Sequence, residues 1–101
     1  MDLQVATTQA SRTRIIGGLM ELERGVRKVR DSYRDSVRTD CDGLVRIVER
    51  IVREKRLQCN VLSTPADLRI ILNEIEGMFG APGDWGYETP IGAALHTIYG
   101  C

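Results

Sequence analysis

Few side chains in this sequence have the type and spacing that catalysis needs. His96 is the only histidine, and no obvious nucleophile stands at helical spacing from it. Two acid pairs, each without a histidine or cysteine at metal-ligand spacing, are interpreted as surface charges: Asp40 with Asp42, and Glu74 with Glu76. Gly17-Gly18 lacks the lysine and the preceding strand of a phosphate-binding loop. We therefore expect no enzyme and no catalytic residue, cofactor or metal.

The three cysteines Cys41, Cys59 and Cys101 form no C-x-x-C pair, and an odd number cannot close a disulfide framework. We expect three reduced thiols that folding does not require.

An arginine ridge is the strongest charged feature. If the chain stays helical, Arg27, Arg30, Arg34 and Arg38 lie within an arc of roughly 80°, with Arg12 further up the same line. Such a ridge could bind nucleic-acid phosphates, an acidic protein surface or the chain's own acidic half, or its charges could be solvated or paired. Interspersed acids and the lack of a known nucleic-acid-binding motif argue against a dedicated nucleic-acid binder.

A glycine-flanked loop, residues 83–88, carries two large aromatic side chains, Trp85 and Tyr87. Tryptophan and tyrosine are enriched among interface hot spots, so both are candidate partner-binding residues. The alternative, which we favour for Trp85, is a side chain folded back as a lid over the core.

A long amphipathic helix is predicted from about residue 11, where Ser11 or Thr13 could cap it. Apolar residues then recur at alternating steps of four and three, and Val37 extends this seam: Ile15, Leu19, Leu22, Val26, Val29 and Tyr33. A spacing of 3.5 residues is typical of a helix whose narrow apolar face packs on another helix. We interpret the seam as a homodimer contact, with packing inside one chain as the alternative.

The seam pattern stops at residues 39–43, where we predict a turn, with a single bent helix as the alternative. A second, antiparallel helix follows from Leu44 and ends near residues 57–59. Its apolar arc of roughly 160° predicts a central position, with three arginines on the opposite side: Arg46, Arg50 and Arg53.

Two shorter helices complete the prediction. Ser63-Thr64-Pro65 begins one that ends at Gly80, and Thr89-Pro90 begins another that ends near Gly100. Residues 81–88 are predicted to form a loop. The fold class is all-α, a small bundle of about four helices.

The chain has 101 residues, 43% hydrophobic and 28% charged, which suits one folded domain over 1–101 with residues 1–10 as a flexible arm. Residues 1–56 have an excess of four positive charges and residues 57–101 an excess of four negative ones. This dipolar pattern favours contact between halves or between subunits.

The sequence has no secretory signal and no apolar run of membrane-spanning length, which predicts a soluble, cytoplasmic protein that makes no membrane contact. We expect a small homodimeric regulator, an inhibitor, anti-activator or adaptor, that binds a larger protein. Two alternatives are a nucleic-acid-binding regulator that uses the arginine ridge, and a structural subunit of a larger assembly.

Overall fold

The computed structural model describes residues 3–100, and it describes side chains for residues 8–34 and 37–100. Within this range the chain forms five helices and no strand: α1 (Leu3–Asp31), α2 (Asp35–Gln58), α3 (Pro65–Phe79), the single turn α4 (Pro82–Trp85) and α5 (Pro90–Tyr99). The predicted all-α bundle with a long first helix and an antiparallel partner is therefore confirmed.

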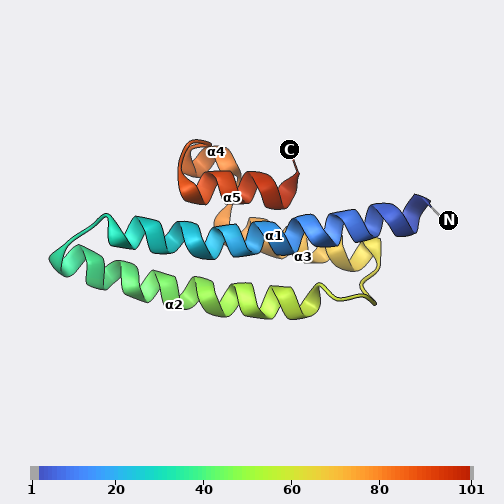
Figure 1. Cartoon of the computed structure of the whole chain (residues 1–101), viewed down its shortest axis with the longest axis horizontal. Coiled ribbons are helices and arrows are strands. Elements are labelled where there is room, and N and C mark those ends of the chain that lie inside the picture. The colour runs from blue at the N-terminus through green and yellow to red at the C-terminus, as the bar shows by residue number, and fades with distance from the viewer. Residues whose placement is uncertain (1–2, 101) are drawn as a thin grey trace.

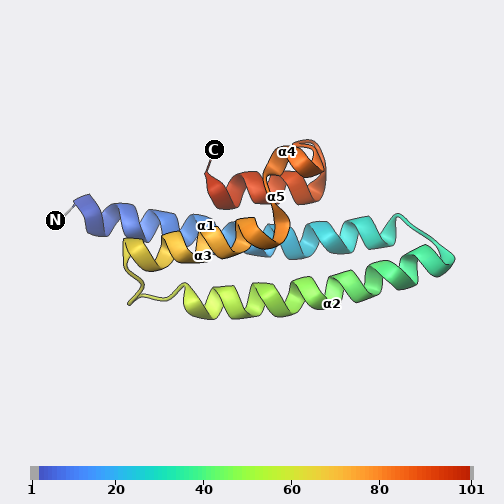
Figure 2. The same ribbon diagram turned by 180° about the vertical axis from the view of Figure 1, so that it is seen from behind.

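Helix α1 is the centre of the bundle. Helix α2 runs antiparallel along one side of α1, and α4 and α5 lie on the opposite side (Figure 1). Helix α3 lies along a third side, in front of α1 when the molecule is turned around (Figure 2). The molecule is elongated, 54 × 24 × 19 Å. The predicted central position of the second helix is thus wrong, since α2 packs mainly on α1.

The core consists almost wholly of aliphatic side chains that meet around α1. Helices α1, α2, α3 and α5 contribute the buried residues: Ile15, Leu19, Leu22 and Val26; Val45, Val48 and Val52; Leu68, Ile71 and Ile75; Ile91, Ala94, Leu95 and Ile98. Such side chains stabilise a fold by about 25 cal/mol for each Å² of apolar surface that they remove from water.

Helix α1 begins earlier than predicted. Residues 3–10, expected as a flexible arm, belong to α1. They include no proline or glycine, and once a helix is nucleated each added residue gains a hydrogen bond at little cost. The beginning of the heptad pattern therefore does not mark the beginning of the helix.

The prediction of a turn at residues 39–43 is wrong, because the turn between the long helices lies at residues 32–34. Helix α2 therefore begins at Asp35 and not at Leu44. At this turn the Ser32 hydroxyl donates to the Val29 carbonyl at 2.7 Å.

Asp42 is accommodated within α2 because it pairs with Arg30 of α1 at 3.4 Å, and Asp40 is exposed to solvent. Gly43 is exposed and costs the helix about 1 kcal/mol at most.

The predicted boundaries of α3 and α5 are confirmed. The Thr64 hydroxyl accepts from the Asp67 amide at 3.1 Å, and the Asp67 carboxylate accepts from the Thr64 amide at 2.9 Å. Thr89 caps α5 through the Gly92 amide at 3.0 Å. Gly80 and Gly100 follow the last residues of α3 and α5 with positive φ, which glycine adopts without strain. Helix α2 ends at Gln58, as expected.

The prediction of a loop over residues 81–88 is wrong for residues 82–85, which form the helical turn α4. They are helical because Pro82 suits a first helical position and the Asp84 carboxylate accepts from the Ala81 amide at 2.9 Å.

Candidate functional site

The predicted dimer seam lies mostly inside the single chain. Four of its side chains, Ile15, Leu19, Leu22 and Val26, are buried in the core, and Val29 packs partly buried against it. Because the protein's own helices cover these side chains, a second copy cannot reach them without opening the bundle.

Tyr33 departs from the predicted seam. It lies in the turn after α1 and is 47% exposed. Val37, which was expected to extend the seam, lies beyond this turn on α2 and is also exposed. Leu44 and Ile47 are further exposed apolar residues, which lie toward the middle of α2.

The arginine ridge is not one helix face. Arg27 and Arg30 belong to α1, whereas Arg34 precedes α2 and Arg38 lies on α2, so the turn separates the two pairs. A common face requires one continuous helix, and local helical periodicity does not reveal this break.

Most of these arginines pair with acids. Arg27 contacts Glu23 at 2.9 Å and Glu49 at 3.1 Å, joining α1 to α2. Arg30 contacts Asp31 at 3.1 Å and Asp42 at 3.4 Å. The hydrogen bond to Asp31 raises the pKa of the Arg30 guanidinium.

Two further arginines of the predicted line are also engaged within the chain. Arg38 lies 3.8 Å from Asp31, and Arg12 donates to the Asn60 carbonyl at 3.4 Å. Most side chains of the predicted arginine ridge therefore make contacts within the protein.

Trp85 is neither a buried lid nor a free hot spot. It is 39% exposed, and its indole nitrogen donates to the Phe79 carbonyl at 2.7 Å. The Tyr99 hydroxyl donates to the neighbouring Gly80 carbonyl at 2.8 Å. Two aromatic donors thus satisfy carbonyls at the end of α3, which have no helical partner.

Tyr87 is exposed and packs edge to face against His96, with ring centroids 5.8 Å apart. Its outward position leaves it available to a partner. His96 is exposed on α5, and Tyr87 is its aromatic neighbour.

A second set of arginines lies on the exposed part of α2, and two of them, Arg53 and Arg56, lie beside Ile16 of α1. Arg46, Arg50, Arg53 and Arg56 are all exposed, and no described carboxylate forms an ion pair with them. We call these residues the α2 arginine stripe. The apolar arc of α2 is the sequence signal for it, since a helix buries one side and leaves the opposite side to solvent.

The most exposed apolar residues follow directly on this stripe. Leu57 is 73% exposed at the end of α2, and Val61 and Leu62 are 81% and 84% exposed in the turn before α3. We call these three residues the apolar turn. No periodic pattern marks Val61 and Leu62, so sequence reasoning did not identify them.

Hydrogen bonds hold the apolar turn in one shape. The Asn60 side chain accepts from the Leu62 amide at 2.8 Å. The Ser63 hydroxyl accepts from the Asn60 amide at 3.0 Å and donates to the Gln58 carbonyl at 2.8 Å. A preorganised surface loses less conformational freedom when it binds, which favours affinity.

A pocket of about 350 Å³ lies beside the apolar turn, lined by Ile16, Arg53, Arg56 and Leu57. It lies between α1 and α2 and combines an apolar floor with two guanidinium groups. This chemistry suits a ligand that is both apolar and anionic.

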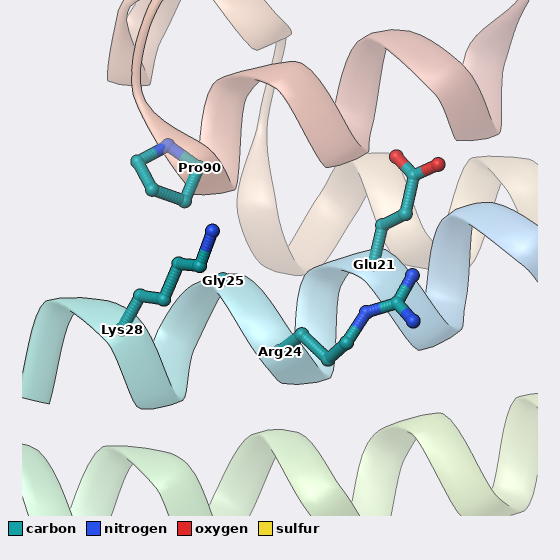
Figure 3. Close-up of a pocket in the computed structure, with 5 residues that line it drawn as sticks. All are labelled: Glu21, Arg24, Gly25, Lys28 and Pro90. Carbon is teal, nitrogen blue, oxygen red and sulfur yellow. The ribbon is translucent and has the colours of Figure 1, made fainter.

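A second pocket, of about 410 Å³, lies between α1 and the start of α5 and is lined by Glu21, Arg24, Gly25, Lys28 and Pro90 (Figure 3). Glu21 and Lys28 rise from α1 on either side of Gly25, toward the α5 side of the pocket. Glu21 accepts from the Thr97 hydroxyl at 3.1 Å, which engages its carboxylate within the protein. This pocket has mixed charge, with the carboxylate of Glu21 near the basic side chains of Arg24 and Lys28.

No group of three histidine, cysteine or acidic side chains in the described part of the chain could share a metal ion. None of the described helices is long and apolar enough to cross a membrane. Compared with known proteins, the chain matches no family model, no curated protein and no solved structure.

Proposed function

We propose that this protein is a small, non-catalytic, cytoplasmic regulator that binds a larger protein as an inhibitor, anti-activator or adaptor. The apolar turn carries the proposal, because Leu57, Val61 and Leu62 expose more than two thirds of their surface on a turn shaped by hydrogen bonds. Single exposed apolar residues are common, whereas a fixed group of them is typical of contact sites. The free thiols Cys41 and Cys59 suit the reducing cytoplasm.

The test is affinity capture from a lysate of the source organism. The double variant Val61→Ser/Leu62→Ser should lose a protein that the wild type retains. Ile70→Ser is the matched control, because Ile70 is an exposed apolar residue on α3 outside the turn. Equal retention by all three proteins would show that the apolar turn is not the contact.

The homodimer belongs to this proposal, although its contact must lie outside the buried seam. The turn between α1 and α2 and the part of α2 that follows it offer exposed apolar side chains for this contact: Tyr33, Val37, Leu44 and Ile47. Light scattering should report a dimer at high micromolar concentration and a folded monomer for Ile47→Glu. A wild-type monomer would remove the homodimer from the proposal and leave partner binding intact.

The α2 arginine stripe favours a second candidate function, nucleic-acid binding. Its test is gel retention of single-stranded and duplex DNA at increasing salt, since phosphate contacts weaken steeply as salt rises. If DNA were retained at physiological salt and released by Arg46→Glu/Arg50→Glu, nucleic-acid binding would replace protein binding as the leading function.

A further inference from the structure

We propose that the pocket beside the apolar turn receives an acidic amphipathic helix of the partner protein. An apolar side chain of that helix would enter the pocket, and its acidic side chains would pair with Arg53 and Arg56. This inference rests on the proposed function and adds the chemistry of the partner.

The shape and lining of the pocket support an apolar anchor. Ile16 is partly buried against the core and Leu57 is largely exposed at the edge. A volume of about 350 Å³ is at the small end of the range for ligand pockets. It therefore suits one or two apolar side chains better than a large cofactor.

Charge complementarity supports an acidic partner. Neither Arg53 nor Arg56 forms an ion pair with any described carboxylate. Glu49 is already bound to Arg27, and Glu54 projects about 100° around α2 from Arg53. The stripe continues to Arg50 and so offers further guanidinium groups to the same partner. Arginine binds carboxylates through two parallel hydrogen bonds, which gives both charge and geometric selectivity.

The apolar turn favours a protein helix over a nucleic acid. Phosphates could contact the α2 arginine stripe, but they would leave Leu57, Val61 and Leu62 in water. Proteins that bind single strands stack bases on aromatic side chains, and the described residues of the pocket and the apolar turn include none. A helix with one apolar and one acidic side covers both kinds of surface.

The probe is a fluorescein-labelled designed peptide with leucines at i, i+3, i+4 and i+7 and glutamates on the flanks of that face. A peptide with glutamine in place of glutamate is its matched partner. Fluorescence anisotropy should show that wild-type protein binds the glutamate peptide, with an affinity that falls as salt rises. The glutamine peptide should bind at least about tenfold more weakly, because charge-assisted hydrogen bonds are lost.

Three variants locate the contact. Arg53→Gln/Arg56→Gln should lower the affinity at least about tenfold and remove most of the salt dependence. Leu57→Asn should lower the affinity for the glutamate peptide and for the glutamine peptide by the same factor. Arg69→Gln is the control, since Arg69 is an exposed arginine of α3 outside the pocket, and it should bind like wild type. All these positions are exposed or line the open pocket, so circular dichroism should show unchanged helicity.

Several results would overturn the proposal. They are equal binding of the two peptides, unchanged binding by Arg53→Gln/Arg56→Gln, and displacement of the peptide by single-stranded DNA at equal concentration. Light scattering that finds a wild-type dimer and an Arg53→Gln/Arg56→Gln monomer would assign the pocket to a second copy of this chain. If no peptide binds but affinity capture of a protein still depends on Val61 and Leu62, the proposal of an acidic helix as partner is wrong and the proposed function stands. If the capture experiment fails, the proposed function fails independently of the peptide result.

Discussion

Gly18 of α1 lies directly against Ile98 of α5, so closely that a methyl group on Gly18 would stand 2.9 Å from the Ile98 backbone nitrogen. Seven residues further along α1, a methyl group on Gly25 would stand 3.0 Å from the Pro90 carbonyl oxygen. Both glycines therefore permit the close approach of α5 along α1. Their neighbour Gly17 faces solvent, and a methyl group there would have no atom within 4 Å apart from those of its chain neighbours and the backbone of its own helix.

Alanine at Gly17 and Gly18 should have opposite effects. Gly18→Ala should lower the free energy of unfolding by about 1–3 kcal/mol, because the packed backbone of α5 must move. Gly17→Ala should raise it by about 0.5–1 kcal/mol through helix propensity alone. Urea unfolding followed by Trp85 fluorescence measures both. Equal effects at the two positions would contradict the close packing of α5 on α1.

Leu22 tests the assignment of the seam to the core of one chain. Leu22→Ala should cost about 2–5 kcal/mol, because Leu22 is fully buried and the cavity that remains cannot fully close. Leu22→Glu/Val26→Glu should give an unfolded chain by circular dichroism. A well-folded monomer of that double variant would instead restore the seam as a contact between subunits.

Trp85 and Tyr99 should each contribute modestly through one hydrogen bond. Trp85→Phe and Tyr99→Phe remove the donors to the Phe79 and Gly80 carbonyls and should each cost about 1 kcal/mol. Trp85→Ala should cost less than the 3–5 kcal/mol typical of a buried tryptophan, because the side chain is 39% exposed. Thermal unfolding by circular dichroism is the measurement. A Trp85→Phe protein as stable as wild type would show that the carbonyl finds another donor.

Asp67 should make the fold sensitive to acid. The hydrogen bond from the Thr64 backbone amide lowers the pKa of the Asp67 carboxyl in the folded chain. A lowered pKa stabilises the fold above the unfolded value of about 4, and this contribution is lost as the pH falls through the folded pKa. Asp67→Asn should therefore lose less stability than wild type between about pH 7 and pH 3.

Urea midpoints at the two pH values measure this difference. Glu76→Gln, at another exposed acid of α3, is the control and should keep the wild-type pH dependence. If Asp67→Asn and wild type lose the same stability in acid, the capping box does not contribute to the pH dependence.

Lys55 joins α2 to α3 from a buried position. It is 7% exposed, and its amino group donates to the Glu74 carboxylate and to the Gln58 side chain. Glu74→Ala should cost about 1 kcal/mol, a modest value because Glu74 is half exposed and water screens it. Lys55→Met should be close to neutral, since it replaces a buried charge by an apolar side chain of similar shape. A larger loss for Lys55→Met than for Glu74→Ala in urea unfolding would contradict this interpretation.

Local patterns in the sequence were enough to predict the fold class and those helix boundaries that depend on neighbouring residues. Thr64-Pro65 with Asp67, Thr89-Pro90 and the terminal glycines place the ends of α3 and α5, because caps act through neighbouring backbone groups. The apolar periodicity of α1 likewise identified four residues of the core. These signals are visible along the chain because each depends on residues only a few positions apart.

The contacts of the long helices could not be predicted from such local patterns, because they depend on how the whole chain packs. The same heptad pattern serves a dimer or a hairpin, and the turn at Ser32–Arg34 makes it a hairpin whose register aligns Arg27 with Glu49. In that register most arginines of the predicted ridge pair with acids of the same chain. Arg53 and Arg56 instead line an open pocket beside Leu57. Val61 and Leu62 carry no periodicity, and their exposure depends on which surfaces α3 leaves uncovered. Contacts between residues far apart in the sequence decide such surfaces, and local propensity does not encode them.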